Sequence, residues 1–303
     1  MMLRRLIQFT SIVVLGSYVA RLEIAVEVEN ESTPPSGWIR ITRDGEFKQR
    51  PVWSPDGTKL LFTRHIGESI QSILRDADGA NEKPLFDNPH PRFDAAFFAD
   101  GKGLAFTFDK ITPGQGDMEL YLADADGENI RPLFVTNGKL SHEEWASPSP
   151  DGKWIACTST RDDNSEVYLI KVDGTDKQRL TSDPALDVHP SFSPDGKKIA
   201  FATDRWGDFE IAIYNLETSL ITRLTESRGL DDYPCWSPDG KQIAFTSRRI
   251  GNLEIYLMQA DGSNPRNLTQ HEGSDNFPTF SPKGEITFCS QRNGEWDLYS
   301  LHP

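Results

Sequence analysis

The chain has 303 residues, with 46 Asp and Glu against 32 Lys and Arg, which gives a formal net charge of −14. This negative charge argues against nucleic acid or an anionic membrane surface as the main partner. Charged residues make up 26% of the chain and apolar residues 37%, which is typical of a soluble globular protein rather than a disordered one. Three cysteines are too few for a disulfide-rich scaffold.

The chain begins with a basic pair and an uncharged, largely apolar segment. Arg4 and Arg5 precede residues 6–20, which carry no charged side chain. This segment is shorter than the ~20 residues that a membrane-spanning helix needs, so the pattern favours a secretory signal peptide over residues 1–20. An uncleaved N-terminal anchor is the first alternative, and an ordinary strand or helix is the second. Residues 21–37 are acidic and rich in Pro and Ser, which predicts a linker, and no later apolar run reaches spanning length.

An internal repeat runs through residues 38–303. The tetrapeptide Ser-Pro-Asp-Gly occurs four times, and degenerate copies stand at 98–101 and 281–284. The third residues of the six copies are separated by 44, 51, 44, 44 and 44 positions, and they are Asp56, Asp100, Asp151, Asp195, Asp239 and Lys283. Each copy predicts a tight turn, because Pro fixes φ and Gly readily adopts the left-handed conformation.

Each repeat unit predicts four short antiparallel strands. In the fifth unit a strand ends at Trp236 before the turn, and further strands are expected over 243–245, 254–256 and 266–269. Six such units without helical periodicity predict an all-β fold, a six-bladed β-propeller of four-stranded antiparallel blades. A solenoid of stacked strands is the competing architecture. The sixth unit ends after its third strand, and residues 38–42 supply a matching fourth strand, so we expect the N-terminal strand to close the last blade.

These units resemble the propeller repeats of the TolB family. The shared pattern runs from Pro-x-Trp/Phe-Ser-Pro-Asp-Gly through Ile-Ala-Phe and Glu-Ile-Tyr to Leu-Thr, and residues 234–269 show it nearly whole. TolB is a periplasmic protein of the Tol–Pal envelope system that binds a peptidoglycan-associated lipoprotein through its propeller. The resemblance covers 38–303 and implies a periplasmic or secreted, non-catalytic, monomeric propeller without a cofactor that binds another envelope or secreted protein. Residues 21–37 are too few for the N-terminal α/β domain of TolB, which is therefore not expected here.

Enzymes also use this repeat. Prolyl-oligopeptidase-type peptidases combine it with an α/β-hydrolase domain that carries a Gly-x-Ser-x-Gly motif, and this sequence contains no such motif. We therefore expect no catalytic residues. Two alternatives stay open: a polysaccharide-binding or carbohydrate-cleaving propeller, whose aromatic residues would stack on sugar rings, and a propeller module that serves a separately encoded peptidase.

The partner site is expected at the mouth of the channel, on the loops that join the blades. Eight positions before each aligned turn residue lies a first ring of candidates, namely Lys48, Arg92, Glu143, Asp187, Asp231 and Asp275. Two positions further on lies a second ring, namely Arg50, Asp94, Trp145, His189, Tyr233 and Phe277. We predict that the first ring binds the partner through its charges, with apolar anchors at Trp145, His189, Tyr233 and Trp206. The alternative is that the first-ring acids accept backbone N–H bonds where each blade begins.

Other polar residues recur from blade to blade. Four loops carry an arginine and an acid five positions apart, which predicts an ion pair in each: Arg161/Glu166, Arg205/Glu210, Arg249/Glu254 and Arg292/Asp297. Five histidines are expected on the mouth face but in different blades, so no metal site is predicted from them: His65, His90, His142, His189 and His271. The cysteines also fall in different blades, which predicts free thiols at Cys157, Cys235 and Cys289. The interval of 51 places its extra residues at 109–117 and 136–144.

Overall fold

The computed structural model describes residues 8–15, 18–25, 37–87, 90–109, 118–134 and 141–303. The chain divides into two compact units, Met1–Pro35 and Ser36–Pro303. The first unit contains the strands β1 (Gln8–Leu15) and β2 (Tyr18–Ala25), which pair antiparallel. Both lie in the segment for which we predicted a signal peptide and a linker, and that assignment stays a prediction. Within the described ranges the chain forms no helix with the length and hydropathy of a membrane span.

The second unit is built of antiparallel strands in sets of four, which we number as sheets 1 to 6. Sheet 1 consists of β4 (Lys48–Trp53), β5 (Lys59–Ile66), β6 (Ser69–Asp76) and β7 (Lys83–Pro84). Sheet 2 consists of β8 (Arg92–Phe97), β9 (Gly103–Asp109), β10 (Met118–Asp124) and β11 (Arg131–Pro132). Sheet 3 consists of β12 (Glu143–Pro148), β13 (Trp154–Ser159), β14 (Glu166–Lys171) and β15 (Lys177–Arg179). A single parallel bridge, Gln71 to Arg92, joins sheets 1 and 2.

Sheets 4 to 6 repeat this order, and the last sheet takes its fourth strand from the start of the unit. Sheet 4 consists of β16 (Asp187–Phe192), β17 (Lys198–Thr203), β18 (Glu210–Asn215) and β19 (Ile221–Arg223). Sheet 5 consists of β20 (Asp231–Trp236), β21 (Gln242–Ser247), β22 (Glu254–Gln259) and β23 (Arg266–Asn267). Sheet 6 consists of β24 (Asp275–Phe280), β25 (Ile286–Arg292), β26 (Glu295–Leu301) and β3 (Ile39–Arg40). β3 pairs with β26 through Ile39 with Ser300 and Arg40 with Tyr299. The predicted all-β fold of four-stranded antiparallel sheets is therefore confirmed.

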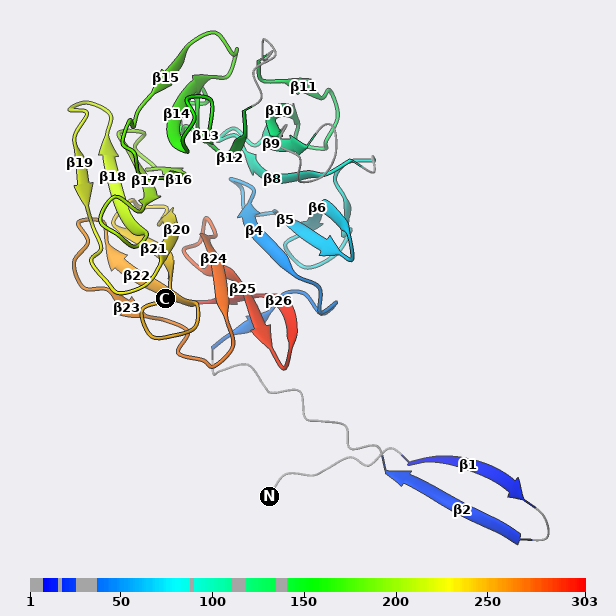
Figure 1. Ribbon diagram of the computed structural model, residues 1–303. Helices are drawn as coiled ribbons and strands as arrows, with labels where there is room; N and C mark the ends of the chain where they lie inside the picture. The colour runs from blue at the N-terminus through cyan, green and yellow to red at the C-terminus, as the bar shows by residue number, and fades with distance from the viewer. Residues whose placement is uncertain (1–7, 16–17, 26–36, 88–89, 110–117, 135–140) are drawn as a thin grey trace. The chain divides into compact units, whose positions relative to one another are not determined.

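The sheets surround a common centre, with the first strand of each sheet innermost (Figure 1). Each first strand contacts the first strand of the following sheet, from β4 through β8, β12, β16 and β20 to β24, and β24 contacts β4 in turn. The loops between second and third strands and the connections between sheets share one end of the unit, because adjacent strands are antiparallel. The Ser-Pro-Asp-Gly turns and the turns between third and fourth strands share the other end. We call these the loop end and the turn end.

The core lies between neighbouring sheets. The second strands of five sheets contribute phenylalanines with an exposed fraction of 1% or less, namely Phe62, Phe106, Phe201, Phe245 and Phe288. Phe245 of sheet 5, for example, packs with Ala200 and Ile213 of sheet 4. Burying one such side chain contributes about 1.5–3 kcal/mol. All three cysteines are free, as predicted, and Cys157 and Cys289 are buried.

Candidate functional site

Every innermost strand is interrupted by a β-bulge at the second ring. The register of the first two strands shifts across this position in all six sheets. The residue inside each bulge has a left-handed φ between +48° and +57°, at Arg50, Asp94, Trp145, His189, Tyr233 and Phe277. Non-glycine residues avoid this conformation, which costs on the order of 1–3 kcal/mol at each position. The six bulges change the direction of these six side chains, so that they point toward the centre of the unit.

Threonines of the neighbouring sheets hold several of these bulges. The N–H of the bulge residue donates to a threonine Oγ1 on the second strand of the preceding sheet in Asp94 to Thr63 (3.1 Å), His189 to Thr158 (3.1 Å) and Phe277 to Thr246 (3.3 Å). In sheet 4 the aligned position is Ala202, and the N–H of Tyr233 donates instead to Asp232 Oδ1 at 2.6 Å. We did not predict these bonds from the sequence, although a threonine stands seven residues after the turn residue in four sheets.

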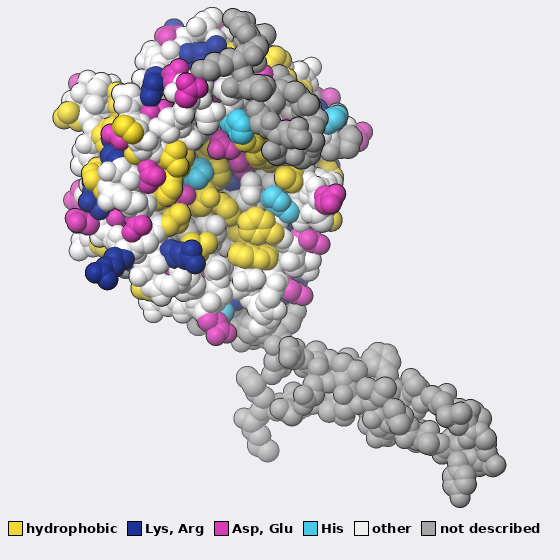
Figure 2. Space-filling view, viewed as in Figure 1, with side chains coloured by type: hydrophobic (Ala, Val, Ile, Leu, Met, Phe, Trp, Pro, Cys, Tyr) yellow, Lys and Arg dark blue, Asp and Glu magenta, His cyan; other side chains and the backbone are white. Residues whose placement is uncertain are grey.

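Five of the second-ring side chains meet at the centre and form what we call the channel cluster: Arg50, Trp145, His189, Tyr233 and Phe277. His189 contacts both Trp145 and Tyr233, with ring centroids 4.7 and 4.3 Å away, and these two rings also contact each other at 5.1 Å. Tyr233 and Phe277 are 4.5 Å apart. Trp145 of sheet 3 and Phe277 of sheet 6 come from opposite sides of the circuit, yet their centroids are only 6.3 Å apart. The cluster therefore spans the centre of the unit, and Figure 2 shows apolar and histidine side chains gathered at the middle of one face.

Arg50 joins the aromatic rings of the channel cluster to the backbone of two neighbouring sheets. Its guanidinium carbon lies 4.4 Å from the centroid of Trp145, and it donates to the carbonyl oxygens of Asp94 and Ala146. Burial lowers the pKa of Arg50 to about 10, while the nearby carboxylates of Asp94 and Glu144 oppose that shift. The side chain therefore stays charged at neutral pH. A cavity of about 220 Å³ adjoins the cluster, and it is lined by the prolines that follow the bulges, among them Pro51, Pro190, Pro234 and Pro278.

Acids and histidines surround the cluster. Burial raises the pKa of Asp94 against the opposing charge of Arg50, and burial also raises the pKa of Glu144. Within the described residues, the carboxylate of Glu144 has no hydrogen bond or ion pair. His189 Nδ1 lies 2.7 Å from Asp232 Oδ1. A half-buried carboxylate beside three aromatic rings gives this end of the channel an acidic, partly apolar character.

The first ring lies deeper than we predicted. Five of its members have an exposed fraction of 0%, namely Lys48, Glu143, Asp187, Asp231 and Asp275, while Arg92 is half-buried. A partner cannot touch fully buried charges directly, so any contribution of these five to binding acts through the loops that they hold. The four acids among them accept hydrogen bonds through their carboxylates. Asp231, for example, accepts bonds from the side chains of Arg249 and Ser247.

The predicted pairing of each loop arginine with the acid five positions later is wrong for sheets 4 to 6. Each arginine pairs instead with the first-ring acid of its own sheet: Arg205 with Asp187 (2.7 Å), Arg249 with Asp231 (2.7 Å) and Arg292 with Asp275 (2.9 Å). Arg161 contacts Glu143 in the same way, at 2.9 Å. The antiparallel register explains this, because it sets the end of the second strand beside the start of the first, as in Ser159 opposite Glu143.

The third-strand acids have partners of their own on the fourth strand. Glu166 accepts bonds from Arg179 (2.7 Å) and Thr181 (2.5 Å), and Glu210 accepts them from Arg223 (3.0 Å) and Thr225 (2.5 Å). In sheet 6 the acid is Asp297, and the arginine and threonine are Arg40 (2.6 Å) and Thr42 (2.6 Å) from the start of the unit. Buried Lys48 also reaches Asp297 Oδ1 at 3.4 Å. We call Arg40, Thr42, Lys48 and Asp297 the terminal latch.

The remaining predicted residues are dispersed. Trp206 is 40% exposed in a loop of sheet 4, and Arg223 and Arg205 lie 4.9 and 5.7 Å from its ring centroid, so it stands apart from the channel cluster. In the part of the chain that the structure describes, no group of three or more His, Cys, Asp or Glu side chains could hold a metal ion. Of the two predicted insertions, residues 110–117 and 135–140 lie outside the described residues.

Known proteins resemble this chain in sequence and in fold. A Tol-Pal system protein TolB from Anaeromyxobacter dehalogenans is 32% identical over 135 residues, which is 45% of this chain and 29% of that protein. The chain therefore matches less than a third of that relative's length. The crystal structure of TolB from Acinetobacter baumannii superposes with a TM-score of 0.68 and 23% identity, over 78% of this chain and 57% of that one.

An enzyme also shares the fold. An oligogalacturonate lyase from Vibrio parahaemolyticus gives a TM-score of 0.60 at 13% identity, over 98% of both chains, and identity at this level shows the fold alone. The family of TolB beta propeller domains matches residues 65–225 and 207–302, which together span most of the chain. The chain therefore belongs to the TolB beta propeller family.

Proposed function

We propose that the chain is an exported, monomeric and non-catalytic scaffold of the cell envelope, periplasmic or secreted, that binds another protein at the loop end of its channel. The proposal includes a closed ring of six blades in which β3 completes the last blade. The TolB relatives and the pairing of β3 with β26 support it. A rigid ring suits this role, because it presents side chains from several blades in a fixed arrangement.

One observation carries the proposal: six innermost strands carry a strained bulge, and the side chains of five of these bulges meet in the channel cluster. Natural proteins keep such conformations where the geometry serves function, since relaxing any one bulge would recover on the order of 1–3 kcal/mol. Trp145, His189 and Tyr233 are half-buried, so each retains accessible surface toward the channel. Rigid aromatic side chains that are partly covered are the residues that dominate protein–protein binding energies. Glu144 adds a negative charge that selects for a basic group on the partner.

The test uses the full chain as bait in an envelope extract of the source organism, with the captured protein identified and its affinity then measured with purified components. Tyr233→Ala removes one aromatic ring from the cluster, and we expect at least about tenfold weaker binding. Glu144→Gln removes one charge without breaking a hydrogen bond, and we expect weaker binding that depends less on salt.

The matched control is Leu220→Ser, at a residue that is 65% exposed on the turn end of sheet 4. It should bind the partner as the wild type does. Thermal melting of all three variants separates lost binding from lost folding. If Tyr233→Ala is folded and binds as tightly as the wild type, the channel cluster is not the binding site.

A further inference from the structure

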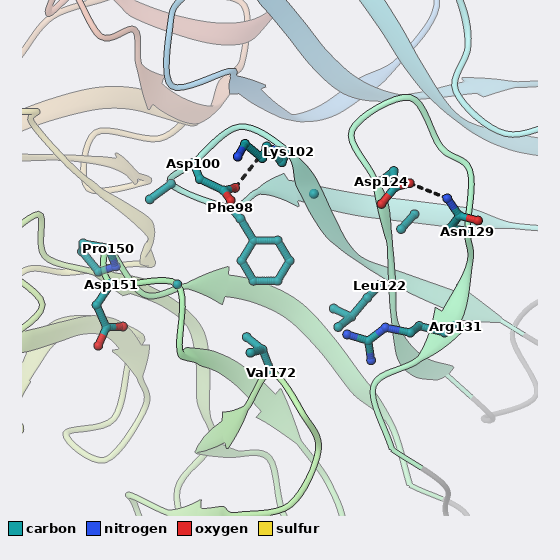
Figure 3. A pocket seen from close by; sticks show the side chains of 14 residues that line it. Phe98, Asp100, Lys102, Leu122, Asp124, Asn129, Arg131, Pro150, Asp151 and Val172 are labelled. Atoms are coloured by element: carbon teal, nitrogen blue, oxygen red, sulfur yellow. Dashed lines mark hydrogen bonds between the residues drawn. The ribbon is translucent and has the colours of Figure 1, made fainter.

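A pocket opens between sheets 2 and 3 at the turn end of the unit, away from the proposed partner site. Its volume is about 570 Å³, which lies within the range of small-molecule sites. In Figure 3 the ring of Phe98 occupies the middle, with Pro150 and Asp151 on one side, Leu122 and Arg131 on the other, and Val172 facing it. The pocket is therefore bounded by the first turn of each sheet and by the third and fourth strands of sheet 2.

The sequence departs from its repeat at this pocket. The turn of sheet 2 reads Phe-Ala-Asp-Gly where four other copies read Ser-Pro-Asp-Gly. Phe98 thus replaces a serine and Ala99 a proline. Three residues after the aligned turn residue stands Gly103, where the other sheets with an Asp-Gly turn carry large side chains, namely Lys59, Trp154, Lys198 and Gln242. The three changes lie side by side in space and all affect the same cavity.

A turn proline is missing at the opening of this pocket. At four of the turn glycines, a Cβ atom would lie 3.6–3.7 Å from the turn proline of the neighbouring sheet, as Gly196 does from Pro150. Gly152 has the same φ of +69° as Gly196, but nothing lies within 4 Å of its Cβ position. Its neighbour across the gap is Ala99, whose methyl group is too short to fill the place of the proline ring. The proline ring that contacts the turn glycine at four other junctions is thus absent from this one.

Glycine at position 103 leaves room for the ring of Phe98. A Cβ atom there would lie 3.1 Å from Phe98 Cδ2 and 3.2 Å from the carbonyl oxygen of Ala123, closer than such contacts normally are. Phe98 and Val172 pack against the buried core that includes Leu122. Phe98 therefore forms a fixed apolar floor, with aliphatic side chains beside it.

Polar groups ring this floor. Asp124 accepts a hydrogen bond from Asn129 Nδ2, and Arg131, Lys102 and Asp151 are exposed around the opening. Asp100 brings the acids at the rim to three, against the two bases Lys102 and Arg131. The rim therefore offers carboxylate, amide and guanidinium groups to which a ligand can hydrogen-bond. Its acids outnumber its bases by one, so the rim has a small net negative charge.

We propose that this pocket binds one ring of a neutral sugar. A pyranose has an apolar C–H face that stacks on an aromatic ring, and hydroxyl groups around its edge that donate to carboxylates and accept from amide and guanidinium groups. The floor of Phe98, Leu122 and Val172 matches the face, and the rim matches the edge. The excess of carboxylates disfavours an acidic sugar.

A neighbouring groove shows what the repeat provides without these changes. It lies between sheets 3 and 4 and is lined by Pro150, Trp154, Gln178 and Phe192, with a volume of about 580 Å³. It keeps the serine and proline of the repeat at Ser149 and Pro150. Size alone therefore does not single out a site, and this groove supplies a matched control.

The experiment titrates the full chain with glucose, galactose and N-acetylglucosamine, and separately with glucuronate, by calorimetry and ligand-observed NMR. We expect saturable binding of at least one neutral sugar below about 10 mM, and weaker binding of glucuronate. Ala99→Pro and Phe98→Ser restore residues that the other turns carry, so both should fold. Each should weaken binding at least about tenfold, because one fills the opening and the other removes the floor.

Gln178→Ala in the neighbouring groove and Tyr233→Ala in the channel cluster should leave sugar binding unchanged, which separates this site from the proposed partner site. Two results would overturn the proposal. One is that none of the three neutral sugars binds the wild type saturably, or that glucuronate binds more tightly than they do. The other is that Ala99→Pro and Phe98→Ser, verified as folded, bind as the wild type does.

Discussion

A serine hydroxyl bonds the turn aspartate in the four Ser-Pro-Asp-Gly turns. Ser54 Oγ donates to Asp56 Oδ1 at 2.6 Å, and the N–H of Thr58 donates to the same oxygen at 3.0 Å. These donors favour the ionised carboxylate, so they lower the pKa of Asp56 to about 2. Asp151, Asp195 and Asp239 have lowered pKa values for the same reason, with a serine as the largest cause.

Replacing this hydroxyl should be visible as a shift in titration. In Ser54→Ala we expect the pKa of Asp56 to rise toward its ordinary value of 3.8. A carboxyl whose pKa is lowered on folding favours the folded state above its unfolded pKa, and that contribution disappears as the pH falls through the folded pKa. The variant should therefore lose less stability than the wild type between pH 4 and pH 2, roughly the interval between the two pKa values. Carboxyl ¹³C NMR follows Asp56 directly.

Ser193→Ala is the control for this titration, because it changes the same hydroxyl in sheet 4. It should raise the pKa of Asp195 and leave that of Asp56 at about 2. An unchanged pKa of Asp56 in Ser54→Ala would mean that the amide and the hydroxyl of Thr58 suffice to keep this pKa low.

At the scale of strands, the bulge is a shared property of two sheets. A buried threonine of one sheet accepts the N–H that the bulge of the next sheet exposes, as Thr158 does for His189. Without an acceptor, that N–H would be buried unsatisfied, at a cost of about 1–3 kcal/mol. The aromatic residue at the centre and the hydroxyl behind it therefore act as one unit.

Thr158→Val tests this coupling with almost no change of side-chain volume. We expect a loss of about 1–2 kcal/mol in the free energy of unfolding, because the N–H of His189 loses its acceptor. Binding at the channel cluster should weaken as well, since His189 contacts both Trp145 and Tyr233. Urea denaturation and partner affinity are the measurements, with Thr218→Val at an exposed turn as the control. A stable variant with unchanged affinity would show that the bulge does not depend on the threonine.

The sequence predicts strands better than it predicts their partners. The period of 44 residues and the proline–glycine turns were enough for the strand order, because both are local signals. The pairing of Arg205 with Glu210 was wrong because closeness in sequence does not imply contact across a hairpin, and the register gives Arg205 to Asp187. The left-handed φ of Trp145 was missed because no glycine marks it. The proline that follows His189, Tyr233 and Phe277 does not itself reveal a bulge.

At the scale of the whole molecule, the two ends of the second unit meet in one sheet. β3 is only two residues long, and its pairing with β26 is reinforced by the terminal latch. Arg40 and Asp297 are 257 positions apart, whereas Arg223 and Glu210, which make the equivalent contact in sheet 4, are 13 apart. The same arginine–carboxylate contact thus joins distant segments of the chain in sheet 6 and the two strands of a single hairpin in sheet 4.

This difference provides a test of ring closure with an internal control. Arg40→Ala and Arg223→Ala remove the same group from the same kind of contact, at positions with 17% and 28% side-chain exposure. Breaking a hydrogen-bonded charged pair of this kind costs about 1.5–3 kcal/mol. In Arg223→Ala the loss should stay local, because a short turn still tethers β19 to β18. In Arg40→Ala the bonds of Thr42 with Asp297 and Leu298 remain, but no short turn joins β3 to β26, so we expect sheet 6 to open more easily.

Hydrogen exchange can distinguish the two outcomes. In Arg40→Ala we expect faster exchange at Leu298, whose N–H donates to Thr42 Oγ1, and at the neighbouring amides of β26. Sheet 1 should follow, because β24 contacts β4 across the junction. In Arg223→Ala the amides of sheets 3 and 5 should remain protected. If both variants lose protection only around the substituted residue, the contacts between first strands hold the ring and the latch adds only local stability. If Arg40→Ala alone exposes sheets 6 and 1 together, the ring depends on its terminal strand.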